Sequence, residues 1–254
     1  MKIGIQVSSL KPLLLTESQV KDAFAKMRAL GCRTVQLQWI GPSVPREAIA
    51  GALQENGMES VSVQDFYETV LDNFEYYVNL NAVTGGTWLC VSRIPERLKS
   101  REGLDGFAAE LRAMQRKLDP FGQRVCFHPV TGDFTAVPGI PAVDYLLEAL
   151  PELSLCLDLY HLNRCCGDMP GFLRRYAGRV CMVHFKDSRG ESLVPAGQGD
   201  TVWTGVVGAC LDAGVSYAFV EQEHWQRDPY ECLKEAMDWL RGEIAACGGE
   251  PPWK

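Results

Sequence analysis

The sequence contains no long hydrophobic run, and this absence argues against a membrane protein. No apolar stretch approaches the roughly 18–20 residues that a bilayer-spanning helix needs. The chain begins MKIGIQVSSLK, in which one lysine precedes a short apolar stretch, without the longer apolar region and small-residue cleavage site of a secretory signal. We therefore expect a cytoplasmic protein with no membrane partner.

Paired cysteine motifs are also missing, although the chain has ten cysteines. There is no CxxC pair, and the vicinal Cys165–Cys166 lacks the spacing of a zinc knuckle. Four others lie inside apolar runs, where a free thiol behaves as a small hydrophobic side chain: Cys90, Cys126, Cys156 and Cys181. We expect all ten cysteines to be reduced.

Positive charge is scarce. The chain has 25 Lys and Arg against 32 Asp and Glu, which gives a formal net charge of −7, and it has no basic cluster. Nucleic-acid-binding proteins usually carry a basic face, because phosphate contacts dominate their affinity. The composition therefore argues against nucleic acid and favours a small-molecule partner.

The sequence does contain a regular alternation of β-rich and helical segments. Eight apolar, β-rich runs occur at residues 2–8, 33–39, 59–65, 86–92, 123–128, 153–158, 180–186 and 216–221. Helical patterns occur at 16–30, 45–56, 67–80, 101–118, 142–149, 169–177, 201–213 and 229–246. Such alternation indicates parallel βαβ units, and eight units close a (β/α)8 TIM barrel of about 250 residues.

We expect this α/β barrel to form one domain over residues 1–254, because no linker or low-complexity tract divides the chain. An open doubly wound sheet is the alternative, but it usually begins with a Gly-rich phosphate loop, and VSSLKPLLL contains no glycine. The first predicted helix carries a capping box from Thr16 to Gln19 and ends at Gly31.

Polar side chains end the last four predicted strands: His128, Asp158, His184 and Glu221. The C-terminal strand ends of a barrel meet at one mouth, where catalytic groups lie. Any one of these residues alone could be incidental, but all four histidines of the chain lie at or just beyond these ends. Two imidazoles and two carboxylates suit Mn²⁺, Co²⁺, Fe²⁺ or Zn²⁺ better than Ca²⁺. The pattern therefore predicts a metal site.

Five segments resemble the xylose isomerase-like barrel superfamily: IGIQVSSL at the start, LDLYH at 157–161, VHFKD at 183–187, GQGD at 197–200 and FVEQEH at 219–224. The superfamily includes sugar-phosphate isomerases and epimerases, inosose dehydratases and endonuclease-IV-type enzymes. The resemblance implies a divalent metal, often Mn²⁺, on the last four strands, and a sugar bound through two neighbouring oxygens. Asp158, His184 and Glu221 match its metal positions, and His161 matches a substrate-contacting histidine.

The fifth strand departs from the superfamily pattern. Many members place Glu there, and others carry His-Asn-His…Glu-Phe, whereas this chain reads HPVTGDF at 128–134. His128 therefore stands where epimerases keep a carboxylate that is both ligand and base. A metal-bound imidazole cannot act as that base, so the base opposite Glu221 comes from Glu223, Lys186 or His161, or is absent.

Several residues near these motifs have weaker assignments. Lys186 could neutralise a developing enolate or could be an ordinary strand-end lysine. Glu223 is a spare base, and Asp187 caps the next turn. Four further side chains line a sugar pocket or pack in the core: Gln6, Gln38, Trp39 and Trp203.

These features predict a metal-dependent isomerase or epimerase of a sugar, sugar phosphate or polyol that works through an enediolate held on the metal. The candidate catalytic residues are Glu221, His161, Lys186 and Glu223. A dehydratase-type lyase on a keto-sugar or keto-inositol is the first alternative, and a non-catalytic barrel subunit of a larger enzyme is the second. A DNA-repair endonuclease needs more histidines and a basic groove. The sequence leaves a homo-oligomer open.

Overall fold

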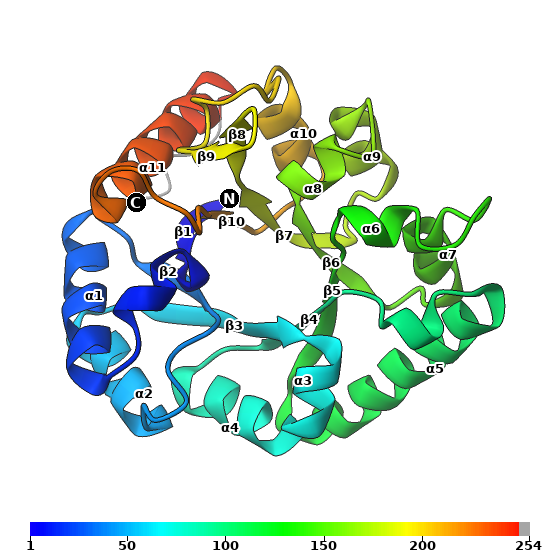
Figure 1. The fold of residues 1–254 in the computed structure, drawn as a ribbon, viewed down its shortest axis with the longest axis horizontal. Coiled ribbons are helices and arrows are strands. Elements are labelled where there is room, and N and C mark those ends of the chain that lie inside the picture. Colours follow the sequence, from blue (N-terminus) through cyan, green and yellow to red (C-terminus); the bar gives the residue numbers. More distant parts are fainter. Residues whose placement is uncertain (249–254) are drawn as a thin grey trace.

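The computed structural model describes residues 1–248, which form a closed barrel of parallel strands with helices around it (Figure 1). The strands follow the order β1-β10-β7-β6-β5-β4-β3-β2. Their bounds are β1 (Lys2–Gln6), β2 (Thr34–Leu37), β3 (Glu59–Phe66), β4 (Trp88–Ser92), β5 (Arg124–His128), β6 (Ser154–Asp158), β7 (Val180–Phe185) and β10 (Tyr217–Val220). The prediction of a (β/α)8 barrel with these eight strands is confirmed.

Helices cover the outer face of the barrel. They are α1 (Glu17–Ala29), α2 (Arg46–Glu55), α3 (Tyr67–Asp72), α4 (Phe74–Thr84), α5 (Arg101–Leu118), α7 (Ala142–Ala149), α9 (Met169–Arg175), α10 (Val206–Asp212) and α11 (Pro229–Ala246), with short 3-10 turns at Glu96–Leu98 and Asp119–Phe121. The predicted capping box of Thr16 and Gln19 begins α1. Within residues 1–248, no helix is both long and apolar enough to cross a bilayer.

Two predicted helices were wrong in extent. The segment 67–80 is two helices, because Asn73 leaves the helical conformation at φ −128° and donates its side-chain amide to Thr69 O. Asparagine often competes with helical hydrogen bonds in this way. The segment 201–213 becomes helical only at Val206, because Gly205 precedes it with φ +74°.

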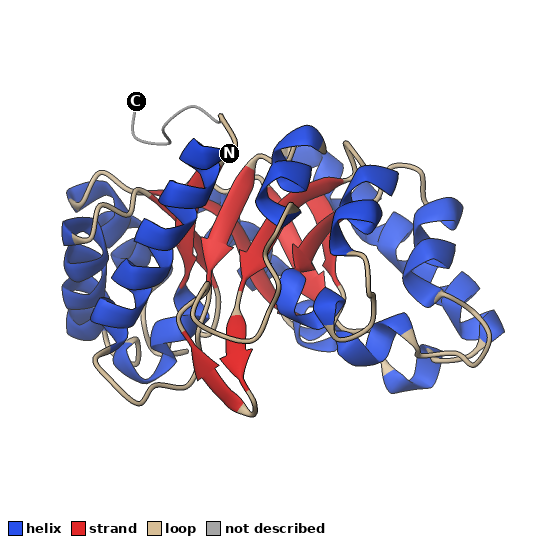
Figure 2. Ribbon diagram, turned by 90° about the horizontal axis from the view of Figure 1, so that it is seen from above, coloured by secondary structure: helices blue, strands red, loops and turns tan. Residues whose placement is uncertain are grey.

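Short elements that the sequence pattern did not predict follow several strand ends. They are the 3-10 helix η1 (Val7–Leu13), α6 (Thr131–Phe134), α8 (Leu159–Asn163) and the antiparallel hairpin of β8 (Asp187–Arg189) and β9 (Ser192–Val194). Figure 2 shows the hairpin projecting from one end of the barrel. These elements surround the mouth of the barrel, which is the end where the C-terminal residues of the strands lie.

The barrel interior is filled by a small sulfur-rich cluster, separate from the larger core between strands and helices. Its buried members are Val61, Cys90, Cys126, Cys156, Met182 and Phe219, and Cys181 packs beside them. All ten cysteines are free thiols. Strand β1 approaches its neighbours closely here, because a Cβ at Gly4 would lie 2.3 Å from the backbone oxygen of Thr34 and 2.8 Å from the Phe219 ring.

We predict that Gly4→Ala destabilises the barrel, because the backbone of β2 cannot move away from the added methyl group without disturbing strand pairing. The loss should be about 1–3 kcal/mol, as for other overpacked cores. Gly51→Ala is the control, since a Cβ at this α2 glycine would have no atom within 4 Å beyond the adjacent backbone of its own helix, and the substitution should be neutral or slightly stabilising. Urea unfolding midpoints of the two variants compare them directly. Equal midpoints would contradict the prediction.

Candidate metal centre

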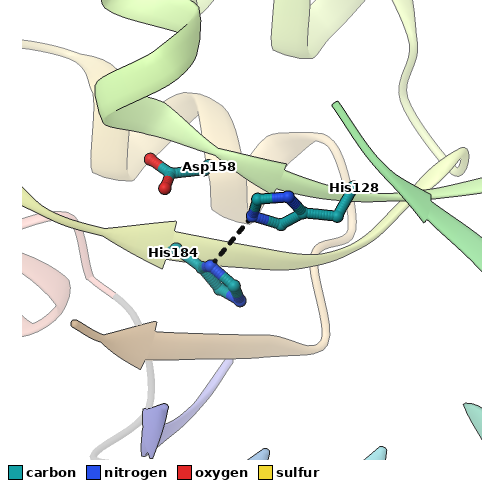
Figure 3. Close-up of side chains that lie close together, drawn as sticks. All are labelled: His128, Asp158 and His184. Carbon is teal, nitrogen blue, oxygen red and sulfur yellow. Dashed lines mark hydrogen bonds between the residues drawn. The ribbon is translucent and has the colours of Figure 1, made fainter. Parts of the chain in front are cut away.

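Three buried side chains bring metal-ligating atoms together at the mouth. His128 ends β5, Asp158 ends β6 and His184 lies in β7, and one ligand atom from each lies within 4.8 Å of the others (Figure 3). Strand register explains this, because Asp158 is paired directly with His184. The Nε2 atom of His128 is 3.3 Å from Nδ1 of His184.

Glu221, which follows β10, joins this group through His184. Its Oε2 lies 3.0 Å from Nδ1 of His184. Its Oε1 accepts a hydrogen bond of 2.9 Å from the hydroxyl of Ser8, a residue of η1. Ser8 was not among the predicted site residues, because a serine in a short apolar segment gives no sign of its role.

The protonation of these groups favours a bound cation. Burial and the neighbouring His184 lower the pKa of His128 to about 3, so its ring is neutral at pH 7. Burial alone would raise the pKa of Glu221, but Lys186 and His184 hold it far below its usual range, so the carboxylate stays ionised. Neutral imidazoles and ionised carboxylates are the forms that bind metal.

The donor set therefore fits a divalent transition metal. Ligand atoms about 2.1 Å from one ion lie roughly 3–4 Å from one another, and the distances above fall near that range. The Nδ1 atom of His128 is buried and has no hydrogen-bond partner among the described residues. His128, Asp158 and His184, with Glu221 beside them, could hold such an ion.

The two carboxylate oxygens of Asp158 have different partners. Its Oδ1 accepts the backbone N–H groups of Tyr160 at 2.8 Å and His161 at 3.2 Å, and so caps α8. Its Oδ2 faces the ring of His161, with Nε2 at 3.7 Å. The carboxylate is thus fixed in orientation by the helix that it begins.

His161 lies in α8, at the side of the three-residue group rather than within it. Its Nδ1 lies 2.9 Å from the hydroxyl of Thr131, which orients the ring. Burial lowers the pKa of His161. Its partly exposed ring, with Nε2 turned toward Asp158, borders the mouth.

Lys186 and Glu223 form an ion pair near the group. Burial alone would lower the pKa of Lys186, but Glu221, Asp158 and Glu223 hold it above its usual value, so the amine stays charged. Burial and Glu221 raise the pKa of Glu223. Three carboxylates (Asp158, Glu221 and Glu223) against one ammonium leave a formal charge of −2, which one divalent cation would balance.

Asp187 has a larger structural role than the turn cap that the sequence predicted. Its fully buried carboxylate accepts N–H groups from Ser188, Gly197, Gly199, Thr201 and the Trp203 indole, at 2.9–3.3 Å. A Cβ at Gly199 would lie 2.2 Å from its Oδ1. The loop after β7 is folded around this one side chain, and Trp203 belongs to that structure and not to a pocket.

The other candidate pocket residues have different surroundings. Gln6 is buried inside the barrel, and Gln38 accepts from Gln64 at 3.4 Å. Trp39 packs edge-on against Phe66, with centroids 5.8 Å apart. Of the four, only Trp39 is partly exposed and follows a strand end.

The altered fifth-strand motif ends in a structural carboxylate. Asp133 is buried, and its oxygens accept the backbone N–H groups of Ile94 at 3.0 Å and Val130 at 2.9 Å. Burial raises the pKa of Asp133 to about 6. This aspartate ties the loop after β4 to the loop after β5 and lies outside the three-residue group.

The fold and this geometry define a (β/α)8 barrel whose mouth holds three buried side chains that could bind a metal ion. The chain belongs to the family described as xylose isomerase-like TIM barrel, which matches residues 24–243. A search of curated proteins finds no match.

Solved structures share the fold at low identity. A sugar phosphate isomerase/epimerase from Parabacteroides distasonis is 13% identical, with 94% of each chain covered and a TM-score of 0.78. An L-ribulose 3-epimerase is 15% identical over 98% of this chain and 96% of the other, with a TM-score of 0.79. A probable 3-DHS dehydratase from Bacillus anthracis is 14% identical over 94% of this chain and 98% of the other, with a TM-score of 0.73.

We predict that Asp158→Asn lowers Mn²⁺ binding at least about tenfold with little change in fold. The asparagine oxygen can still cap α8, whereas the charged oxygen is lost. Asp168→Asn is the control, because Asp168 also caps a helix, accepting Gly171 N at 2.8 Å, but lies outside the group. Elemental analysis after dialysis against Mn²⁺ measures the effect. Full occupancy in Asp158→Asn would remove Asp158 from the ligand set.

We also predict a pH effect on stability from Asp133. Its carboxyl has a pKa of about 6 in the folded protein against 3.8 ordinarily, so between pH 7 and pH 5 only the folded state takes up this proton. Acidification therefore favours the folded state, and this contribution disappears as the pH rises through 6.

Compared with Asp133→Asn, which cannot titrate, the wild type should gain about 1 kcal/mol between pH 7 and pH 5. Urea unfolding of both proteins in EDTA at several pH values measures the difference. Asp200→Asn is the control, since Asp200 is exposed and should follow the wild type. If the Asp133→Asn and wild-type curves stay parallel, Asp133 is not the titrating group.

Proposed function

We propose that the protein is a metal-dependent isomerase or epimerase of a sugar, sugar phosphate or polyol. The observation that carries this proposal is the convergence of His128, Asp158 and His184 on one point at the C-terminal mouth of the barrel, with Glu221 beside them. The mouth is where barrel enzymes place their chemistry. The named activities of the structural neighbours agree with this class.

The proposed ligands are Asp158, His184, Glu221 and His128. Their mixed nitrogen and oxygen donors suit Mn²⁺ best, with Zn²⁺, Co²⁺ and Fe²⁺ as alternatives. A divalent metal bound there would polarise a carbonyl oxygen and so acidify the neighbouring C–H bond.

We propose that Glu223, rather than Glu221, is the base that accepts the proton from the substrate. One oxygen of Glu221 accepts the hydroxyl of Ser8, and the other lies 3.0 Å from Nδ1 of His184, where it would serve as a metal ligand. The side chain of Glu223 is 25% exposed and reaches the open mouth, with one oxygen on Lys186. Burial and Glu221 raise the pKa of Glu223, which makes it the better proton acceptor of the two.

Lys186 and His161 have supporting roles in this scheme. The Lys186 ammonium orients Glu223 and offers positive charge to an enediolate oxygen that forms beside it. His161, held by Thr131, donates a hydrogen bond to a substrate oxygen or returns the proton from its own side. None of these roles needs His128 to exchange a proton.

A dehydratase-type lyase on a keto-sugar or keto-inositol is the second candidate. The observation that favours it is His128, an imidazole at the position where epimerases of the family keep a carboxylate. With one base fewer, proton removal followed by loss of a β-substituent is a natural outcome. The probable dehydratase among the structural neighbours has this same fold. The third candidate, a non-catalytic barrel subunit, gives no reason for the proposed metal ligands to lie together.

The reaction class can be tested with the Mn²⁺-loaded protein and a panel of ketoses, their phosphates and keto-inositols in D₂O. NMR then identifies the product and the deuterated carbon. An isomer or epimer that carries deuterium next to the carbonyl supports the first candidate, and an unsaturated product supports the lyase. No exchange with any compound, although metal is bound, would favour the non-catalytic subunit.

We predict that His161→Ala keeps its metal but loses turnover by about 10²–10⁴-fold, as when a positioned acid–base group is removed. Thr131→Val is the matched variant, because it removes only the contact that orients the ring and should lose less. Metal analysis beside steady-state kinetics separates the two effects. Loss of metal from His161→Ala would make His161 a ligand instead.

A further inference from the structure

The ring of His184 has different partners on its two nitrogens. Nδ1 faces the site, 3.0 Å from Glu221 Oε2 and 3.3 Å from His128 Nε2. Nε2 faces the barrel interior, 2.5 Å from the side-chain oxygen of Gln36 in β2. The residues His184 and Gln36 are 148 positions apart in sequence, and both are fully buried.

The orientation of the Gln36 amide follows from a backbone group. The backbone N–H of Ser8 can only donate, and it lies 3.4 Å from Oε1 of Gln6. The other end of the Gln6 amide, Nε2, must therefore donate, and it does so to Gln36 Oε1 at 3.0 Å. Gln36 Oε1 is thus an acceptor that also faces His184.

An acceptor at this position requires a proton on Nε2 of His184. The ring can then bind a metal only through Nδ1, the nitrogen that faces Glu221 and His128. The same short segment also holds Glu221, because Ser8 donates its hydroxyl to Oε1. A chain of polar contacts from Ser8 through Gln6 and Gln36 therefore orients two of the proposed ligands. They are Glu221 and His184.

We propose that Gln36 is a positioning residue, which fixes His184 in the tautomer that offers Nδ1 to a metal. This inference rests on the metal site proposed above. Outer partners of this kind typically account for 10–100-fold in metal affinity. The alternative partner of Nε2 is the Cys156 thiol at 3.2 Å, but sulfur is a weak acceptor and does not fix the proton.

The first test compares two buried glutamines of the barrel. Gln36→Leu removes the acceptor, whereas Gln64→Leu removes a glutamine that contacts Gln38 and Cys90 but not His184. Titration with Mn²⁺, followed by electron paramagnetic resonance of the free ion, should show affinity 10–100-fold weaker for Gln36→Leu and close to wild type for Gln64→Leu. Gln36→Glu keeps an acceptor oxygen and should retain the affinity that Gln36→Leu loses.

The second test reads the tautomer directly. In the metal-free wild type with ¹⁵N-labelled histidine, proton–nitrogen correlation spectra should show His184 with a proton on Nε2. In Gln36→Leu the proton should no longer be confined to Nε2 of His184, whereas in Gln64→Leu it should remain there. A merely structural role for Gln36 would lower stability without changing the tautomer.

The results separate this inference from the proposed function. If the wild type binds no Mn²⁺, the metal site fails, while the spectrum of the metal-free protein still decides the role of Gln36. A wild-type His184 without a proton on Nε2 would overturn the inference, and so would unchanged Mn²⁺ affinity in Gln36→Leu. If Gln36→Leu does not fold, the position of the His184 proton in the wild-type spectrum is sufficient to support or overturn the inference.

Discussion

Closure of the parallel sheet is the constraint on which the site depends. Because all eight strands run in one direction around the barrel, their C-terminal residues share one rim, and groups that are remote in sequence become neighbours. His128 and His184 are 56 positions apart, yet their ring nitrogens lie 3.3 Å from each other. The close approach of β1 at Gly4 belongs to the same requirement, since a side chain there would push adjacent strands apart.

Polar groups buried at this rim cost folding free energy, and the protein limits that cost by giving them fixed partners. Asp158 has one oxygen on the backbone of α8, Glu221 has one on Ser8, and His184 has one nitrogen on Gln36. In each case the other oxygen or nitrogen of the side chain faces the space between the proposed ligands. The site is therefore preorganised by contacts that lie outside it.

Regular periodicity made the barrel and the polar strand ends predictable, because both depend on local patterns of apolar and polar residues. The contacts that orient those ends were not predictable in the same way. Gln36, within RTVQLQW, looks like any polar residue of a strand, and its contact with His184 arises only when the barrel closes. The helix break at Asn73 depended on one side-chain hydrogen bond, which a count of apolar positions does not register.

The Asp187 carboxylate gives the loop after β7 an unusual property. Gly197 is exposed, and Gly199 and Thr201 are half-buried, yet their amide groups all donate to one fully buried side chain. Hydrogen exchange at such amides requires that carboxylate to release them. The three amides should therefore exchange slowly and together, so that a segment at the surface opens as a single cooperative unit and not residue by residue.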